Sequence, residues 1–303
     1  MNSSNALIQQ IHSLKEQHQA IILAHNYQVP EIQDVADFIG DSLELSRKAS
    51  ETDAKLIIFC GVLFMAETAK ILSPEKRVIL PVINAGCPMA DMIKDSQLKK
   101  LKEKHPDTPV VCYVNSSAEV KALSDICCTS ANALQIVESL AADQVIFVPD
   151  QGLGGYVAEN SSKKIILFPG YCPTHYHIKP QDLLEAKKRW PETPVIVHPE
   201  CNKEVRDLSD FIAGTGGMVK LAQNHSSNEF IIGTEEGMIY RLHNLIPNKK
   251  FHLLSQKLYC PNMKKTKLED LHRSLTLQEP EILIPPGILN QARHAMLKML
   301  HID

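Results

Sequence analysis

The chain has 303 residues, of which 44% are apolar and 22% charged, with 18 Pro and 13 Gly. This composition is typical of a globular protein with a sizeable core, and it excludes disordered, collagen-like and coiled-coil proteins. The 32 basic and 35 acidic residues give a formal net charge of −3, so we expect neither nucleic acid nor a membrane surface as a partner.

The first predicted element is an N-terminal helix, because Leu7, Ile11 and Leu14 follow helical spacing with polar residues between them. This segment lacks the apolar stretch of an export signal, and no apolar run reaches the roughly 20 residues that span a bilayer. We therefore expect a cytoplasmic protein. In that compartment the eight cysteines are expected to be thiols, metal ligands or core residues rather than disulfides.

A threefold repeat begins at the next predicted element, an apolar strand that ends in His25-Asn26-Tyr27. Comparable strands end in Tyr113-Val114-Asn115 and His198-Pro199-Glu200, so the triplets start 88 and 85 residues apart. A hydroxyl residue lies 17 positions after the start of each triplet. These residues are Ser42, Ser130 and Thr215.

Each repeat continues with a second and a third apolar strand and ends in a Cys-Pro dipeptide. The dipeptides begin at Cys87, Cys172 and Cys260. Because the strands are short, apolar throughout and bounded by Pro and Gly, they indicate parallel strands covered on both faces. Each repeat therefore predicts the order helix, strand, helix, strand, helix, strand, and each is too small to be stable alone.

The predicted fold is α/β, with three similar small parallel-sheet αβα domains related by pseudo-threefold symmetry around a central active site. We expect the first domain to comprise residues 1–86 together with 262–303, the second 87–171 and the third 172–261. The C-terminal segment should pack back on the first domain, which otherwise lacks a helix after its third strand. Parallel sheets bind ligands at the carboxyl ends of their strands, where the triplets, hydroxyls and cysteines all fall.

The three in-register cysteines are candidate metal ligands. Three thiolates at one point would suit a cubane iron–sulfur cluster with three irons anchored and one open, a Lewis acid for substrate oxygens. A zinc site or buried repeat cysteines would explain the spacing equally well. The other cysteines have no counterparts in the repeats. Cys60 and Cys112 are expected in the core, Cys127 and Cys128 as packed thiols, and Cys201 as a structural residue near the site.

The triplets place six polar side chains near the candidate metal site: His25, Tyr27, Tyr113, Asn115, His198 and Glu200. Glu200 is the one carboxylate among them and the natural general base, provided that partial burial raises its pKa. Ser42, Ser130 and Thr215 fall near predicted helix starts, where a hydroxyl caps the helix or helps to bind an anion. Three such starts around one axis predict a multiply anionic substrate, and His175 adds a possible cation or proton donor.

The glycine-rich segment 152–155 lacks the spacing of a dinucleotide-binding fingerprint, so we do not expect NAD as a cofactor. We expect this segment to be a mobile loop. No motif places a lysine among these polar groups, which argues against a Schiff base between the protein and a substrate.

Eight motifs together resemble the quinolinate synthase family over nearly the whole chain. They are HNYQ at 25, GDSLELS at 40, FMAETAKIL at 64, CPMADM at 87, YVNSSAEVKA at 113, CTSANA at 128, HPEC at 198 and CPNMK at 260. The resemblance implies a transferase of NAD biosynthesis that condenses iminoaspartate with dihydroxyacetone phosphate to give quinolinate, phosphate and water. It also implies three similar α/β domains around one site, and a functional link to an enzyme that produces iminoaspartate.

By the same resemblance, Cys87, Cys172 and Cys260 hold a 4Fe–4S cluster whose fourth iron is open to substrate. The implied catalytic residues are Tyr27, His198 and Glu200, with Tyr27 and Glu200 transferring protons. The implied substrate-binding residues are His25, Ser42, Tyr113, Asn115, Ser130, His175, His198, Glu200 and Thr215. The chain departs from the family at 213–216, which read Ala-Gly-Thr-Gly where Gly-Ser-Thr-Ser is common, so Gly214 lacks one hydroxyl.

Two other functions fit the residues alone. A non-catalytic iron–sulfur redox sensor would use the three cysteines without needing Glu200. A zinc-dependent hydrolase would instead need histidine and carboxylate side chains as the metal ligands.

Overall fold

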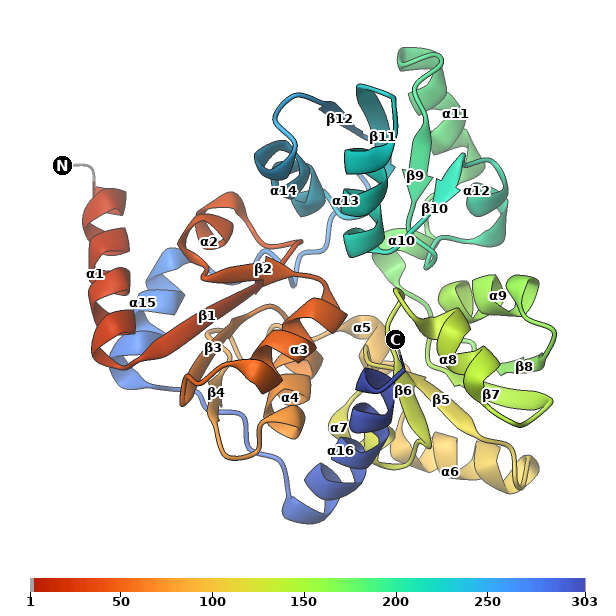
Figure 1. Ribbon diagram of the computed structural model, residues 1–303, viewed down its shortest axis with the longest axis horizontal. Helices are drawn as coiled ribbons and strands as arrows, with labels where there is room; N and C mark the ends of the chain where they lie inside the picture. The colour runs from red at the N-terminus through yellow and green to blue at the C-terminus, as the bar shows by residue number, and fades with distance from the viewer. Residues whose placement is uncertain (1–2, 303) are drawn as a thin grey trace.

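The strands of the protein form three separate parallel sheets. The computed structural model describes residues 3–302, and within them each sheet has four strands. Figure 1 shows the three sheets, each with its own flanking helices, arranged around a common centre. The prediction of an α/β fold built from three parallel-sheet layers is therefore confirmed.

The first unit, which we define as α1 to β4, has the strand order β2-β1-β3-β4. The central strands β1 and β3 are almost entirely buried, which explains their continuous apolar sequence. The elements are α1 Ser3–Gln17, β1 Ala20–His25, α2 Pro30–Val35, β2 Phe38–Gly40, α3 Ser42–Glu51, β3 Leu56–Cys60, α4 Leu63–Leu72 and β4 Arg77–Ile79.

The second unit, from α5 to β8, repeats this topology with the strand order β6-β5-β7-β8. Pro88 begins α5, the helix that opens the unit, as expected for a residue that lacks a backbone N–H. The elements are α5 Pro88–Asp91, α6 Asp95–Lys104, β5 Val110–Tyr113, α7 Ala118–Ala122, β6 Ile126–Cys128, α8 Ala133–Ser139, β7 Gln144–Val148, α9 Gln151–Asn160 and β8 Lys164–Leu167.

The third unit, from α10 to β12, has the order β10-β9-β11-β12, and two further helices follow it. The elements are α10 Pro173–Tyr176, α11 Pro180–Arg189, β9 Val195–Val197, α12 Lys203–Asp207, β10 Phe211–Ile212, α13 Thr215–Asn224, β11 Glu229–Gly233, α14 Gly237–Leu245, β12 Lys250–Leu253, α15 Leu268–Leu277 and α16 Pro286–Leu300.

The number of strands in each repeat was predicted wrongly. Each unit has four strands rather than three, because a short edge strand (β2, β6 or β10) follows the helix that comes after the first strand. These strands have only two or three residues, too few to give an apolar run that pattern reading can detect. The extra strand places the first strand of each unit inside its sheet, so the polar triplets end central strands.

Two local expectations were also wrong. The glycine-rich segment 152–155 is not a loop but lies in helix α9, where Gly152 and Gly154 are buried. The C-terminal segment does not pack on the first unit alone. Helix α15 packs against α1, whereas α16 packs mainly against α7 and β6 of the second unit and also touches α4 of the first. The apolar side of α16, with buried Ala292, Ala295, Met296 and Met299, therefore covers the junction between two units.

Candidate active site

The predicted site residues converge on one cavity of about 270 Å³ in the centre of the molecule. It is lined by every one of them: His25, Tyr27, Ser42, Cys87, Tyr113, Asn115, Ser130, Cys172, His175, His198, Glu200, Thr215 and Cys260. The three triplets reach the cavity because β1, β5 and β9 each end there. This is the carboxyl end of each parallel sheet, next to the position where the strand order reverses.

The cysteines of the three Cys-Pro dipeptides stand at the start of tight turns. Cys87 and Cys172 immediately precede α5 and α10, and Pro261 after Cys260 begins a turn. Each sulfur faces backbone N–H groups two or three residues ahead, at Ala90 and Met89, at His175, or at Met263 and Asn262. Burial raises the pKa of all three thiols, to about 12 for Cys87.

Two buried carboxylates that the sequence analysis missed hold these turns. The Asp150 carboxylate accepts a hydrogen bond from the Cys172 N–H (3.1 Å), and the Glu235 carboxylate accepts one from the Cys260 N–H (3.1 Å). Both acids are fully buried, and burial raises the pKa of each. Their sequence signal was available, because each lies one or two residues beyond the end of a buried strand, 85 residues apart.

The first unit has a valine in place of these acids. Backbone hydrogen bonds fix the equivalence, because Leu63 N–H donates to Ala85 just as Gln151 N–H donates to Gly170 and Glu236 N–H to Leu258. The residues immediately before these donors are Val62, Asp150 and Glu235. The Cys87 turn therefore has an apolar neighbour where the other two turns have a carboxylate.

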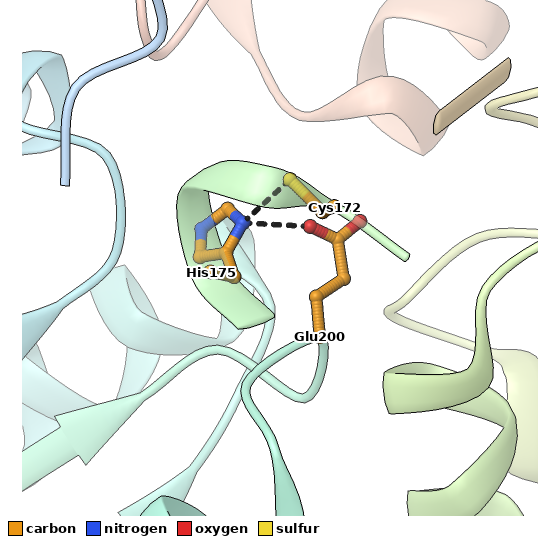
Figure 2. Close-up of side chains that lie close together, drawn as sticks. All are labelled: Cys172, His175 and Glu200. Carbon is orange, nitrogen blue, oxygen red and sulfur yellow. Dashed lines mark hydrogen bonds and ion pairs between the residues drawn. The ribbon is translucent and has the colours of Figure 1, made fainter. Parts of the chain in front are cut away.

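Glu200 accepts hydrogen bonds from two sides of the cavity. Tyr113 Oη donates to Glu200 Oε1 (2.7 Å), and His175 Nδ1 lies 2.7 Å from Glu200 Oε2. The same nitrogen lies 3.2 Å from the Cys172 sulfur, as Figure 2 shows. The opposite ring nitrogen, Nε2, bonds to Thr234 Oγ1 (2.8 Å), and that hydroxyl bonds to Tyr27 Oη (2.5 Å). A continuous hydrogen-bonded chain thus joins Tyr27 to Glu200.

Thr234 is a second residue that the sequence analysis missed. It is fully buried directly after β11, and its register counterparts are Pro149 and Gly61, which have no hydroxyl. Comparison of the repeats identifies positions where all three units carry similar side chains, so it did not identify a hydroxyl present in one unit only.

The charge states of the buried groups differ from the expectation for Glu200. Burial alone would raise its pKa, but His198 and His175, with the hydrogen bond from Tyr113, lower the pKa of Glu200 to about 2. Burial lowers the pKa of His25 and His198 to about 3, and it raises the pKa of the Tyr27 and Tyr113 hydroxyls. At neutral pH Glu200 is therefore ionised beside the neutral imidazoles of His25 and His198 and the neutral phenols of Tyr27 and Tyr113. The raised pKa that would suit Glu200 as a general base is not found.

The three hydroxyl residues do not act as helix caps. Ser42 is the first residue of α3, and Asp41 caps that helix by accepting from the Leu43 and Glu44 N–H groups (2.9 Å each). Ser130 precedes Asn132, the residue before α8. Thr215 is the first residue of α13 and accepts a hydrogen bond from Asn26 (3.0 Å). Gly214 offers no side-chain cap to α13, but the Asp41 carboxylate also accepts a hydrogen bond from the Gly216 N–H of this helix. Asp41 therefore binds N–H groups at the starts of both α3 and α13.

The five remaining cysteines are buried and unpaired. This agrees with the core positions expected for Cys60 and Cys112 and with free thiols at Cys127 and Cys128. Cys201 is fully buried at the start of the α12 region, with its sulfur 3.8 Å from the Gly233 carbonyl, and it does not line the cavity.

The atoms in the cavity that could bind a metal fall into two groups: Cys172 with His175 and Glu200, and the three turn thiols. Among residues 3–302, the one group of at least three ligand-type atoms within 4.8 Å of one another is Cys172, His175 and Glu200. The His175–Glu200 distance of 2.7 Å is that of a hydrogen bond and is short for two ligands of one zinc ion. Cys87 and Cys260 lie outside this group, so the three turn thiols are spaced more widely than the ligands of a single ion.

No helix in the described part of the chain is both long and apolar enough to cross a membrane.

Comparisons with known proteins agree on one family. The sequence model described as "Quinolinate synthetase A protein" matches residues 9–301. A relative named quinolinate synthase from Dehalococcoides mccartyi (strain CBDB1) is 56% identical over 292 residues, which cover 96% of this chain and 97% of the relative. A relative of that name from Clostridium kluyveri is 48% identical, covering 98% of each chain, and quinolinate synthase 1 from Methanosarcina acetivorans is 50% identical, covering 98% of this chain and 97% of its own.

Proposed function

The chain belongs to the quinolinate synthetase A family of NAD biosynthesis, and from this premise we propose that it condenses iminoaspartate with dihydroxyacetone phosphate. The products that balance the atoms are quinolinate, phosphate and two molecules of water. The observation that carries the proposal is the meeting of three Cys-Pro thiols and the Glu200 hydrogen-bond network in one cavity.

The cavity residues fit a 4Fe–4S cluster held by Cys87, Cys172 and Cys260. Three soft sulfur ligands face one space, each beside backbone N–H groups that stabilise a thiolate, and they are spaced too widely for one ion. When bound, such a cluster supplies an open iron, which acts as a Lewis acid toward a substrate carboxylate or hydroxyl.

We assign the anionic groups of the substrates to the side of the cavity where α3 and α13 begin, at Ser42 and Thr215. The partial positive charge of a helix start favours an anion there. The Asp41 carboxylate already accepts from N–H groups of both helices, so the hydroxyls carry much of the expected binding. Ser42 and Ser130 add hydroxyls on the other sides of the cavity, and neutral His25 and His198 can donate N–H groups to carboxylate oxygens.

Proton transfer in the condensation falls to Glu200 and Tyr27. Ring formation requires removal of a proton from carbon and loss of two hydroxyl groups as water. Glu200 Oε2 is the charged acceptor in the cavity, and Tyr27 Oη is a protonated donor linked to it through Thr234 and His175. Because the Glu200 pKa lies low, Glu200 remains ionised at neutral pH, and His198 and Asn115 complete its surroundings.

The proposed function is accompanied by assignments of domains, compartment and partner enzyme. The proposed domains are residues 1–86 with 262–303, residues 87–171 and residues 172–261, with helix α16 of the C-terminal segment extending from the first domain over the second. We place the enzyme in the cytoplasm and link it to an enzyme that supplies iminoaspartate, since an unstable imine must be formed where it is consumed.

Quinolinate formation by Glu200→Gln tests the proposal. The amide keeps the shape of the side chain but cannot accept a proton, so we expect turnover to fall at least about a hundredfold while iron content stays unchanged. Wild-type protein purified without oxygen is the reference. A redox sensor would show no quinolinate formation at all, and an unchanged rate in Glu200→Gln would refute the role of this residue.

Metal analysis of Cys172→Ser separates the cluster from a zinc site. The cluster proposal expects loss of iron and sulfide together. A zinc hydrolase using His175 and Glu200 would keep nearly all of its zinc in this variant, and that result would refute the cluster assignment.

A further inference from the structure

Three buried side chains outside the catalytic cavity occupy one register position in the three units. They are Gln33 in α2, Lys121 in α7 and Arg206 in α12, at separations of 88 and 85 residues. Each is at most 3% exposed, although glutamine, lysine and arginine are rarely buried. Sequence analysis did not single them out, because an amide, an ammonium and a guanidinium look unrelated when compared as letters.

Each of these side chains donates to two carbonyls, one in its own unit and one in a neighbouring unit. Lys121 Nζ donates to Ser116 O (2.6 Å) and to Phe64 O (3.4 Å) at the start of α4 in the first unit. Arg206 Nη1 donates to Cys201 O (2.5 Å) and to Gly152 O (3.1 Å) at the start of α9 in the second unit.

Gln33 completes the set. Its Nε2 donates to Gln28 O (2.9 Å) and to Gly237 O (3.2 Å) at the start of α14 in the third unit, and also to Asn26 O (3.2 Å). The own-unit acceptors, residues 28, 116 and 201, keep the 88 and 85 spacing, and so do the neighbour-unit acceptors, residues 64, 152 and 237. The helices make the same contacts, since α2 packs on α14, α7 on α4 and α12 on α9 (Figure 1).

We propose that Gln33, Lys121 and Arg206 form a closed ring of hydrogen bonds between the units and act as positioning residues for the catalytic loops. We call each of these three side chains, with its two carbonyl acceptors, a latch. The second unit is latched to the first, the third to the second and the first to the third. Each latch holds the loop that follows the first strand of its own unit, which carries Tyr27, Asn115 or Glu200. This role rests on the proposed function only for its kinetic consequence.

Two of the latched contacts lie directly on the proposed proton-transfer residues. A Cβ added to Gly152 would lie 2.4 Å from the Glu200 carbonyl oxygen, and one added to Gly237 would lie 2.7 Å from that of Tyr27. Both distances are too short for a real side chain, so the neighbouring helix start packs on the backbone of Glu200 or Tyr27. Opening either contact would therefore displace these residues relative to the other two units.

Gln33, the uncharged residue of the three, lies beside a buried cation, Lys264. Lys264 Nζ donates to Tyr27 O (2.7 Å) and pairs with Glu235 (2.9 Å). Together Gln33 and Lys264 bind the carbonyls of three consecutive residues, Asn26, Tyr27 and Gln28. A second buried cation here would face Lys264, which gives a physical reason for an amide in place of the lysine or arginine used elsewhere.

Hydrogen exchange of single variants tests the ring without any assay of catalysis. In Gln33→Met, which removes the donors but leaves no unpaired charge, we expect faster exchange at the start of α14 in another unit, as well as near α2. Arg206→Met should do the same at the start of α9, and Lys121→Met at the start of α4. Gln181→Met is the matched control, because Gln181 is exposed and bonds only within α11 to Glu185.

Kinetics of the iron-loaded enzyme test the positioning role. We expect Arg206→Met to lower kcat about tenfold with KM within about twofold, because a displaced reactive group costs rate rather than binding. Arg206→Lys, which keeps a charged donor of the kind used at Lys121, should restore kcat to within about threefold. A purely structural residue would lower the yield of folded enzyme but not its kcat.

The inference is overturned if faster exchange stays within the mutated unit, or if Arg206→Lys is no better than Arg206→Met. If Arg206→Met does not accumulate, the exchange pattern of Gln33→Met decides. A wild-type protein that forms no quinolinate would refute the proposed function, while the exchange measurement would still decide whether the ring exists.

Discussion

The Cys-Pro turns of the second and third units are anchored by buried acidic side chains, whereas the turn of the first unit is not. A buried carboxylate binds the backbone N–H of Cys172 and of Cys260, but Val62 occupies the matching position near Cys87. The backbone of the three turns is nevertheless alike, since the same backbone hydrogen bond recurs beside each. The units share a scaffold, and their functional differences lie in single side chains placed on it.

Burial of Asp150 and Glu235, the two acids that anchor these turns, costs free energy. A buried carboxylate loses its hydration, and Glu235 recovers part of this loss by pairing with Lys264, which is itself 8% exposed. Asp150 has no such cation among its bonded partners in the described chain and relies on N–H donors from Leu153 and Cys172. The third turn is therefore held by an ion pair, the second by hydrogen bonds and the first by apolar packing.

Removal of a turn cysteine should have the largest effect, and the loss of iron should be the same at all three turns although they are anchored differently. Cys87→Ser, Cys172→Ser and Cys260→Ser are each expected to lose iron and to lower quinolinate formation by about a hundredfold or more, because the cluster proposal makes all three thiols ligands. Cys60→Ala, at a buried cysteine outside the cavity, is the control and should retain iron. Normal iron content in Cys87→Ser alone would make the unanchored turn a non-ligand.

Breaking the ion pair of the third turn should have the next largest effect. Lys264→Met leaves the Glu235 carboxylate buried without its cation, so we expect the free energy of unfolding to fall by about 3–5 kcal/mol in denaturant titrations. The double variant Lys264→Met with Glu235→Gln removes the uncompensated charge and should recover part of that loss. No recovery would show that packing, rather than charge, holds this turn.

The second turn should become less stable when Asp150 loses one of its acceptor oxygens. Asp150→Asn removes one acceptor oxygen and is expected to lower the free energy of unfolding by about 2 kcal/mol and to speed iron loss to a chelator about tenfold. Val62→Ala at the matching position of the first unit should leave the rate of iron loss unchanged. Equal rates in the two variants would remove the distinction between anchored and unanchored turns.

The predicted effect that is smallest near neutral pH concerns a position at which the first and third units agree. Burial lowers the pKa of His25 and His198 to about 3, below the unfolded value near 6.5. The unfolded state therefore binds more protons, and the free energy of unfolding of the apoprotein should fall as pH drops from about 6.5 toward 3. We expect each histidine to contribute roughly 1 kcal/mol per pH unit.

Substitution of either histidine checks this slope. His25→Gln and His198→Gln should each flatten the pH dependence by about the same amount. Tyr113 occupies this position in the second unit and does not ionise in the range, so Tyr113→Phe should leave the slope above about pH 5 unchanged. Below that pH the lost hydrogen bond to Glu200 adds its own contribution. A slope that is unaffected by both histidine variants would contradict their neutral, buried state.

Much of the site could be predicted because the repeat makes position informative. His25, Tyr113 and His198 end the same strand in successive units, so parallel-sheet geometry alone places them at one edge. The residues of the three triplets reached the cavity for that reason, whereas His175 lies in helix α10 and was noted only for its place after Cys172. The edge strands β2, β6 and β10 escaped detection because two or three residues carry too little pattern.

Features that depend on three-dimensional neighbours could not be predicted in this way. The pKa of Glu200 follows from Tyr113, His175 and His198, whose orientations the sequence does not specify. Gly152 reads as a loop residue, yet it is glycine because the Glu200 carbonyl packs on helix α9. Thr234 and Val62 differ from their register counterparts, and a search for similarity between repeats passes over such positions.

The central claim is that the three turns, although anchored differently, together hold one iron–sulfur cluster. Iron and acid-labile sulfide, measured per chain after purification without oxygen, test it most directly. The account predicts about four irons and four sulfides per chain, lost together in the Cys87, Cys172 and Cys260 serine variants. A colourless protein containing a single zinc ion, retained in Cys87→Ser, would contradict it.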